Sequence, residues 1–249
     1  MKHKKAKGII FFLLIMSVIL MLASLIWKKA YRDPNVLKQK EKQESDEAFN
    51  QLLANSITKK NQYKWKIVIN PSHGGNDVGY QVNDINEKNI TLSIAQKIKD
   101  GNQNSQVGIF LTRDSDTNPS VEQRINMIEQ MDADIFIDLN VSKDTQSSTF
   151  GTSVFYKTDY YNSELTNVTF ADIMEQNIVK AIEGKAIGIF ESDDEEFSLL
   201  IDQKIPSLSV TCGYISNIKE GEMLTREAYQ NNFANGVLSA IDEVIEKLY

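Results

Sequence analysis

The sequence predicts an α/β domain in which a twisted sheet, mostly parallel or mixed, is flanked by helices. From residue 65 onward, short apolar runs of strand length alternate with longer amphipathic segments of helical period. The chain has 249 residues, 41% of them apolar, which is enough for one sizeable domain. No internal repeat or low-complexity segment interrupts the pattern. We therefore expect a single domain over residues 63–249.

The strands of this domain are expected where apolar runs are short and bounded by polar or turn-forming residues. Five segments satisfy this description: residues 65–70, 107–112, 135–140, 154–156 and 208–211. In an open α/β sheet, functional sites gather at the carboxyl ends of the strands. Residues that directly follow these segments are therefore the first candidates for a site.

The helices are predicted from residue spacing and from the residues at their ends. One face of the helix after the first strand carries three isoleucines, Ile90, Ile94 and Ile98. Ser120 and Gln123 form a capping box that begins the next helix. Two longer helices are expected over residues 167–182 and 225–248.

The N-terminal part of the chain differs from the domain in composition. Residues 8–27 form an uncharged apolar run of 20, which matches a hydrocarbon core of about 30 Å. This run predicts an uncleaved transmembrane signal anchor between a cytoplasmic tail at residues 1–7 and a helical juxtamembrane stalk at residues 28–62. The predicted localisation is the cell membrane, with one membrane pass and the C-terminal domain outside the cytoplasm.

The predicted stalk carries four apolar residues at helical spacing, Phe49, Leu52, Leu53 and Ile57. This stripe either docks on the chain's own domain or contacts a partner or a second copy. The sequence does not separate these two alternatives.

Residue counts exclude several classes of function. Residues 61–249 carry 15 Lys and Arg against 29 Asp and Glu, so this acidic part of the chain is not expected to bind nucleic acid. The single cysteine, Cys212, cannot form an internal disulfide and is expected to be buried. Histidine occurs only at His3 and His73, and His3 precedes the apolar run. The domain therefore has one imidazole with which to bind a metal.

Several short motifs follow one another along the domain. They are, in chain order, INPSHGGND, NEKN, FLTRDSD, a later arginine, ADIFIDLNVS, GTSVFY and SVTCGYISN. Their order and spacing, across residues 66–249, resemble those of the zinc-dependent N-acetylmuramoyl-L-alanine amidases of the amidase 3 family. The resemblance implies a sheet sandwiched by helices and an action on peptidoglycan outside the membrane. There the family cleaves the amide that joins muramic acid to the first L-alanine of the stem peptide.

The resemblance also assigns site positions and indicates that the site is degenerate. It places one zinc histidine at His73 and a glutamate ligand at Glu87, whereas Asn140 stands in place of the second histidine and Thr211 in place of the catalytic glutamate. A hydrolytic zinc needs three protein ligands and a water, and carboxamide oxygen is a poor ligand beside imidazole. Threonine does not act as a general base near neutral pH, and a positioned base is worth about 10² to 10⁴-fold.

Neighbouring residues offer a partial replacement for the missing ligand. Asp138 lies two residues before Asn140, so both side chains point to the same face of the strand, and Asp138 is a candidate substitute ligand. The predicted lining of the binding groove is Asn76, Asp138, Asn140 and Thr211. We expect no cofactor beyond weak or residual zinc binding.

These observations together favour a membrane-anchored, extracytoplasmic amidase-like protein that is catalytically inactive. Its predicted ligand is a peptidoglycan fragment or a cell-wall-remodelling protein partner. The first alternative is an active peptidoglycan amidase with an altered metal site. The second alternative is a structural component of an envelope complex.

Overall fold

The computed structural model describes residues 2–30, 34–157, 165–192, 199–200 and 204–248, with side chains of residues 13–27 in the first range. The chain divides into two compact units, Met1–Glu44 and Ser45–Tyr249. Helix α1 (Lys2–Ala30) belongs to the first unit, and helix α2 (Pro34–Lys60) contributes residues to both. The second unit contains the sheet and all later helices.

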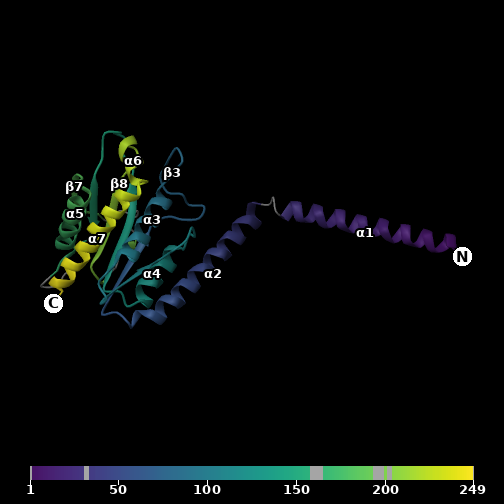
Figure 1. The fold of residues 1–249 in the computed structure, drawn as a ribbon, viewed down its shortest axis with the longest axis horizontal. Coiled ribbons are helices and arrows are strands. Elements are labelled where there is room, and N and C mark those ends of the chain that lie inside the picture. Colours follow the sequence, from purple (N-terminus) through teal and green to yellow (C-terminus); the bar gives the residue numbers. More distant parts are fainter. Residues whose placement is uncertain (1, 31–33, 158–164, 193–198, 201–203, 249) are drawn as a thin grey trace. The chain divides into compact units, whose positions relative to one another are not determined.

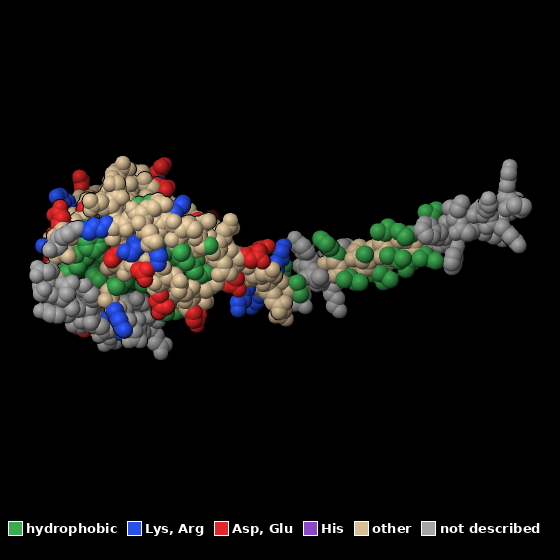
Figure 2. All heavy atoms as spheres, turned by 90° about the horizontal axis from the view of Figure 1, so that it is seen from below, with side chains coloured by type: hydrophobic (Ala, Val, Ile, Leu, Met, Phe, Trp, Pro, Cys, Tyr) green, Lys and Arg blue, Asp and Glu red, His purple; other side chains and the backbone are tan. Residues whose placement is uncertain are grey.

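The predicted membrane anchor is not supported by helix α1. The side chains described in it are mostly apolar and exposed (Figure 2). Among the described residues, however, no helix is both long enough and apolar enough to cross a bilayer. The predicted cell-membrane localisation is therefore wrong, and among the described residues neither an anchor at residues 8–27 nor membrane contact through it is supported.

A six-stranded sheet with the order β4-β1-β5-β8-β6-β7 forms the centre of the second unit. Its strands, in chain order, are β1 (Trp65–Pro71), β4 (Val107–Leu111), β5 (Ile135–Ser142), β6 (Thr152–Tyr156), β7 (Ala186–Glu191) and β8 (Ser207–Tyr214). All neighbours are parallel except β6 and β8, which are antiparallel. The predicted α/β class, with a mostly parallel, mixed sheet, is confirmed (Figure 1).

Helices cover both faces of the sheet. Helices α3 (Glu87–Gly101), α5 (Asn167–Ile182) and α7 (Glu227–Lys247) pack on one face. Helix α4 (Val121–Gln130) and the docked part of α2 pack on the other. The expected capping box of Ser120 and Gln123 is present, and α5 has the predicted bounds. Three short elements were not expected: the hairpin of β2 (Gln81–Val82) and β3 (Ile85–Asn86), and helix α6 (Ile218–Leu224).

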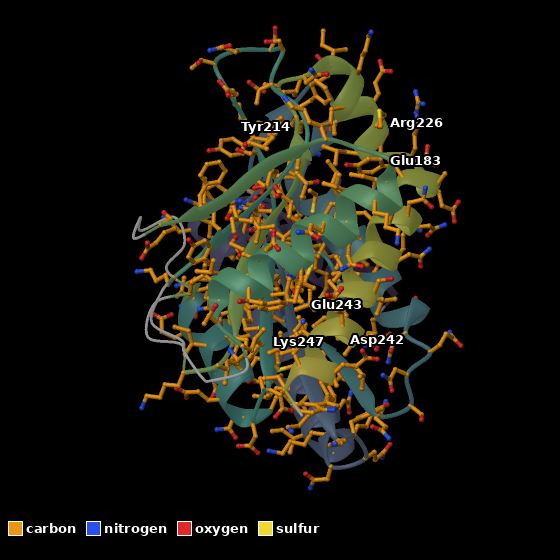
Figure 3. All side chains as sticks on the ribbon, turned by 90° about the vertical axis from the view of Figure 1, so that its left-hand side faces the viewer. Glu183, Tyr214, Arg226, Asp242, Glu243 and Lys247 are labelled. Atoms are coloured by element: carbon orange, nitrogen blue, oxygen red, sulfur yellow. The ribbon has the colours of Figure 1, made fainter. Side chains whose placement is uncertain are left out.

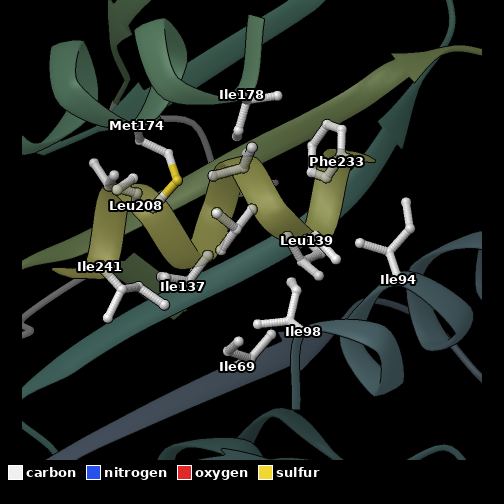
Figure 4. Close-up of a cluster of buried hydrophobic side chains, with 14 of the residues drawn as sticks. Ile69, Ile94, Ile98, Ile137, Leu139, Met174, Ile178, Leu208, Phe233 and Ile241 are labelled. Carbon is white, nitrogen blue, oxygen red and sulfur yellow. The ribbon is translucent and has the colours of Figure 1, made fainter. Parts of the chain in front are cut away.

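The larger hydrophobic core lies between the sheet and helices α3, α5 and α7. Figure 4 shows Ile94 and Ile98 of α3 beside Ile137 and Leu139 of β5. Successive side chains of a strand point to opposite faces, so Asp138 and Asn140 lie on the face away from this core. The core thus fixes the direction of the candidate site residues on β5.

The apolar stripe of α2 docks on its own domain, as the first of its two alternatives proposed. Phe49 is 2% exposed and belongs to a second core cluster with residues of α4 and the sheet, and Leu53 packs against this cluster. Ile57 remains 37% exposed. The hydrophobic stripe is therefore used within the chain at Phe49 and Leu53.

Strand β7, which was not predicted, forms one edge of the sheet. Its pairing with β6 shifts register between Thr152 and Ser153. Beside this shift, Glu175 of α5 accepts a hydrogen bond from the backbone N–H of Gly188 through Oε1, at 2.7 Å.

At the end of β8, Tyr214 lies far from the C-terminal turns of α7 that carry Asp242 and Lys247 (Figure 3).

Candidate functional site

His73 lies on a tight turn that directly follows β1. Its φ of 62° is in the left-handed region, and Gly74 and Gly75 also have positive φ. The imidazole lies between two carboxylates, with Nε2 at 3.2 Å from Glu87 Oε2 and Nδ1 at 2.9 Å from Asp77 Oδ2. Burial lowers the pKa of His73, but hydrogen bonds and charges from Glu87 and Asp77 outweigh burial and raise the pKa to about 9. The ring is therefore an imidazolium at neutral pH.

Glu87 is the first residue of α3 and is 1% exposed. Its Oε1 accepts the backbone N–H of Val141 at 2.7 Å, and its Oε2 accepts that of Tyr80 at 2.9 Å. Gly79 permits this arrangement, because a Cβ there would lie 2.5 Å from Glu87 Oε2 and 2.6 Å from His73 Cδ2. The carboxylate thus joins the helix, strand β5 and the histidine turn.

Asn140 and Thr211 lie opposite each other on the neighbouring strands β5 and β8. Thr211 donates a hydrogen bond from Oγ1 to Asn140 Oδ1 at 2.9 Å, and Asn140 donates from Nδ2 to Ser209 Oγ at 2.7 Å. Thr211 is 1% exposed, and Asn140 is partly buried. The two positions that the family resemblance assigns to a histidine and a glutamate are therefore joined by neutral hydrogen bonds.

Asp138, the candidate substitute ligand, has both carboxylate oxygens engaged within the protein. Oδ1 accepts from Asn70 Nδ2 at 2.6 Å and from Ser72 Oγ at 2.8 Å, and Oδ2 accepts from Ser209 Oγ at 2.7 Å. The positive charge of Arg124 also interacts with the Asp138 carboxylate, which raises the pKa of Arg124 against the effect of burial. A metal ion would have to replace hydrogen bonds that already satisfy this buried carboxylate.

The residues present do not fit the zinc site that the fold family implies. His73 and Glu87 approach each other, but the described residues contain no group of three or more His, Cys, Asp or Glu side chains that could hold a metal ion. A catalytic zinc requires three protein ligands.

The structure brings the predicted site residues together in two groups. His73 and Glu87 form one group, and Asp138, Asn140 and Thr211 form the other. The backbone N–H of Val141, which Glu87 accepts, links the groups. The fourth predicted groove residue, Asn76, is exposed on the turn after Gly75.

Sequence reasoning missed two polar residues of these groups. Asp77, four residues after His73, binds its Nδ1. Ser209 connects Asp138 to Asn140. Its position two residues before Thr211, and hence on the same face of the strand, is the signal that could have indicated it.

Two buried arginines hold the turn that carries His73. Arg113 donates from Nε to the carbonyl of Pro71 at 2.9 Å and from Nη2 to that of Ser72 at 3.0 Å. Arg124 donates from Nη2 to the carbonyl of His73 at 3.1 Å. Burial lowers the pKa of each guanidinium to about 10, which leaves both charged at neutral pH. The turn is therefore fixed by charged donors to its backbone.

Comparisons with known proteins agree with this fold. Residues 67–243 match the Amidase_3 family model, described as N-acetylmuramoyl-L-alanine amidase. The uncharacterized protein YqiI of Bacillus subtilis is 26% identical, over 73% of this chain and 85% of that protein. The amidase CwlM of Bacillus licheniformis is 28% identical, over 69% of this chain and 65% of its own length, just under two thirds.

Among solved structures, the catalytic domain of CwlV, an N-acetylmuramoyl-L-alanine amidase from Bacillus (Paenibacillus) polymyxa var. colistinus, is similar to this chain. It superposes with a TM-score of 0.66 and is 26% identical. The match covers 73% of this chain and 98% of the CwlV domain.

Proposed function

This chain belongs to the amidase 3 family of N-acetylmuramoyl-L-alanine amidases, and we propose that it binds a peptidoglycan fragment without hydrolysing it. The observation that supports this proposal is the hydrogen bond from Thr211 Oγ1 to Asn140 Oδ1. It joins the two positions where the family resemblance expects a zinc histidine and a catalytic glutamate. The fold is retained around them, whereas both groups that hydrolysis needs are absent.

The chemistry of hydrolysis explains why these two positions matter. A bound zinc would supply a water of strongly lowered pKa, and a general base would be needed to take the proton of that water. The Asn140 carboxamide is occupied by Thr211 and Ser209, and a threonine hydroxyl does not accept this proton. Loss of the base alone costs about 10² to 10⁴-fold in rate.

The side chains around the strand ends supply hydrogen-bonding groups for a ligand. His73 has a side chain that is 32% exposed and carries a positive charge, and Asn140 is partly buried. A muramyl peptide presents amide groups and carboxylates, which such donors recognise. The domain itself is acidic, so binding depends on these local contacts rather than on long-range attraction. This condition also suits a cell-wall-remodelling protein partner.

A second candidate function is an active amidase with an altered metal site. The contact of 3.2 Å between His73 Nε2 and Glu87 Oε2 favours it, because these two residues occupy the positions of two family ligands. In this case a third donor would have to come from the ligand or from a rearranged Asp138.

Two measurements on the full chain separate these candidates. Calorimetry with a purified muramyl peptide tests binding, and chromatography of the same peptide after incubation with zinc tests cleavage. We expect saturable binding, weakened at least about tenfold by His73→Ala because a charged donor is lost, and no cleavage. Lys180→Ala, on the exposed surface of α5, is the matched control.

Other outcomes would contradict the proposal. Cleavage that His73→Ala or a chelator abolishes, together with about one zinc per chain, would establish the active amidase. Absence of both binding and cleavage would favour a protein partner or a structural role in an envelope complex.

A further inference from the structure

Residues 45–60 of α2 lie outside the part of the chain that matches the family model, yet they belong to the same compact unit as the sheet. Phe49 is buried in the second core cluster, between α4 and the sheet. At the end of the helix, Lys60 Nζ lies 2.6 Å from Asp132 Oδ2 and donates to the carbonyl of Gln130 at 2.7 Å. This segment, the docked part of α2, is thus fixed by apolar and polar contacts.

The docked part of α2 also contacts the loop between β4 and α4. Ser45, which is buried, accepts the backbone N–H of Asn118 through Oγ at 3.1 Å. Asp46 accepts from Gln123 Nε2 at 3.0 Å. The first turn of the docked helix therefore holds the loop at Asn118 and the start of α4 at Gln123.

The same loop packs against the histidine turn, the turn of residues 73–75. Asp116 Oδ1 accepts the backbone N–H of Gly75 at 2.8 Å. A Cβ on Gly74 would lie 2.0 Å from the carbonyl oxygen of Thr117, so the turn and the loop approach at backbone distance. A side chain at Gly74 would push them apart.

Asn118 provides a second connection between the loop and the turn. Its Oδ1 accepts from Arg124 Nη2 at 3.3 Å, and the same nitrogen donates to the carbonyl of His73 at 3.1 Å. A continuous series of contacts therefore runs from Ser45 through Asn118 and Arg124 to His73.

We propose that the docked part of α2 is a positioning element for the histidine turn, because it holds the loop of residues 116–118 against Gly74 and Gly75. Detachment of this helix loosens the turn and displaces His73. A protein that binds α2 and draws it away would thereby weaken ligand binding at a site that it does not touch. This inference concerns the free chain and holds whichever ligand the site takes.

Amide hydrogen exchange of the full chain, followed by NMR, tests the proposal without any ligand. The informative probe is the N–H of Gly75, which is bonded to Asp116 and not to α2. Ser45→Ala removes the acceptor of Asn118 N–H and should accelerate exchange at Gly75 by about tenfold, while the core amide of Val210 is unchanged. Ser45→Thr keeps the hydroxyl and should restore slow exchange.

Three further variants separate positioning from general stability. Phe49→Ala should detach the helix and accelerate exchange at Gly75 more than Ser45→Ala does. Gln51→Ala, on the exposed face of α2, should leave Gly75 unchanged. Ile241→Val destabilises the larger core, so it should accelerate amide exchange at Val210 as well as any exchange change that it causes at Gly75.

The proposal is overturned if Ser45→Ala accelerates exchange at Asn118 and leaves Gly75 unchanged, because coupling then ends at the loop. It is equally overturned if Ser45→Ala accelerates amide exchange at Gly75 and Val210 together, in the same way as Ile241→Val does. In that case α2 contributes to global stability alone. If Phe49→Ala does not fold, Ser45→Ala and its rescue by Ser45→Thr still decide between these outcomes.

Discussion

The two groups of site residues, although linked through one backbone N–H, differ in their chemistry. His73, Glu87 and Asp77 form a charged group in which an imidazolium lies between two carboxylates. Asn140 and Thr211 form a neutral group in which hydroxyl and carboxamide bond to each other. The resemblance assigns family ligands to His73 and Glu87 of the charged group, whereas in the neutral group it expects a histidine and a glutamate at Asn140 and Thr211. The strand ends of this fold are thus held together without a histidine at position 140 or a glutamate at position 211.

The difference follows from what each side chain does for the backbone. Glu87 accepts two backbone N–H groups, that of Val141 in a buried bond and that of Tyr80 in a partly buried one, so its carboxylate serves the fold whether or not it binds a ligand. Asn140 and Thr211 bond only to side chains in the contacts described above, and these contacts can be supplied by other polar pairs. A residue whose side chain satisfies the backbone is therefore costly to replace.

The largest effect is expected from Glu87→Ala, which would test whether the charged group is structural. The change leaves the N–H groups of Val141 and Tyr80 without their acceptor and removes the buried partner of His73. We expect the free energy of unfolding to fall by about 3 to 5 kcal/mol, measured by urea denaturation. Asp77→Ala removes the more exposed partner and should cost less than about 1 kcal/mol. Equal losses in the two variants would contradict this ranking.

The next prediction concerns the neutral group, into which two substitutions introduce the residue types that the resemblance expects. Asn140→His together with Thr211→Glu supplies the family residues on the retained framework. With zinc present, we expect cleavage of a muramyl peptide to rise by at least about 10²-fold, or about 2.7 kcal/mol of barrier, measured by chromatography of the products. Each single variant should remain near background. If the double variant takes up no zinc, the framework has changed beyond these two positions.

A pH experiment tests Glu220, a buried carboxyl that is bonded to the last residue of β8. Glu220 accepts the backbone N–H groups of Tyr214 at 2.7 Å and of Gly151 at 2.9 Å, yet burial outweighs these bonds and raises its pKa to about 7. A carboxyl whose pKa is raised on folding stabilises the fold below its ordinary value of 4.5 and loses this contribution as pH rises through about 7.

Glu220→Gln removes this titration and isolates its effect. Between pH 4.5 and 8, the unfolding free energy of the unaltered chain should fall by roughly 1 to 3 kcal/mol relative to the variant. The measurement is urea denaturation of both proteins at several pH values. His73 contributes a further decrease in both proteins as pH rises from 6.5 through about 9, so only the difference between them is informative. Parallel curves would show that folding does not raise the pKa of Glu220.

The smallest effect is expected from Thr211→Val, which removes one hydroxyl and keeps the shape of the side chain. Asn140 Oδ1 loses its donor, so unfolding free energy should decrease by about 1 kcal/mol. Thermal denaturation detects a change of this size. Ser209→Ala, which breaks bonds to both Asp138 and Asn140, should cost more. If Thr211→Val lowered the unfolding free energy more than Ser209→Ala, the bonds of Ser209 to Asp138 and Asn140 would contribute less than the single bond of Thr211.

The sequence predicted the buried elements of the fold better than the exposed ones. Strands β1, β4, β5 and β8 are largely buried and appear as apolar runs, whereas β7 is half exposed and contains Gly188, so it lacks that pattern. The hairpin of β2 and β3 has strands of two residues each, too short for any period. The cell-membrane localisation predicted from the hydropathy of residues 8–27 was wrong.

The sequence named candidate site residues but did not indicate their contacts. The resemblance named His73, Glu87, Asn140 and Thr211, because each lies in a legible motif. Register between β5 and β8, which places Asn140 opposite Thr211, depends on long-range packing that a linear sequence does not contain. Likewise, the carboxylate of Asp138 accepts hydrogen bonds from residues of other strands and turns, which its own sequence neighbours do not indicate.

The edge strand β7 carries a consequence for the behaviour of this protein in concentrated solution. An open sheet edge offers backbone donors on which another molecule can extend the sheet, and so begin aggregation. Here the N–H of Gly188 is already occupied by Glu175, and burial raises the pKa of that carboxyl. Acidification therefore protonates Glu175 at a higher pH than an ordinary glutamate, and the bond that covers Gly188 N–H at this edge then loses its charged acceptor.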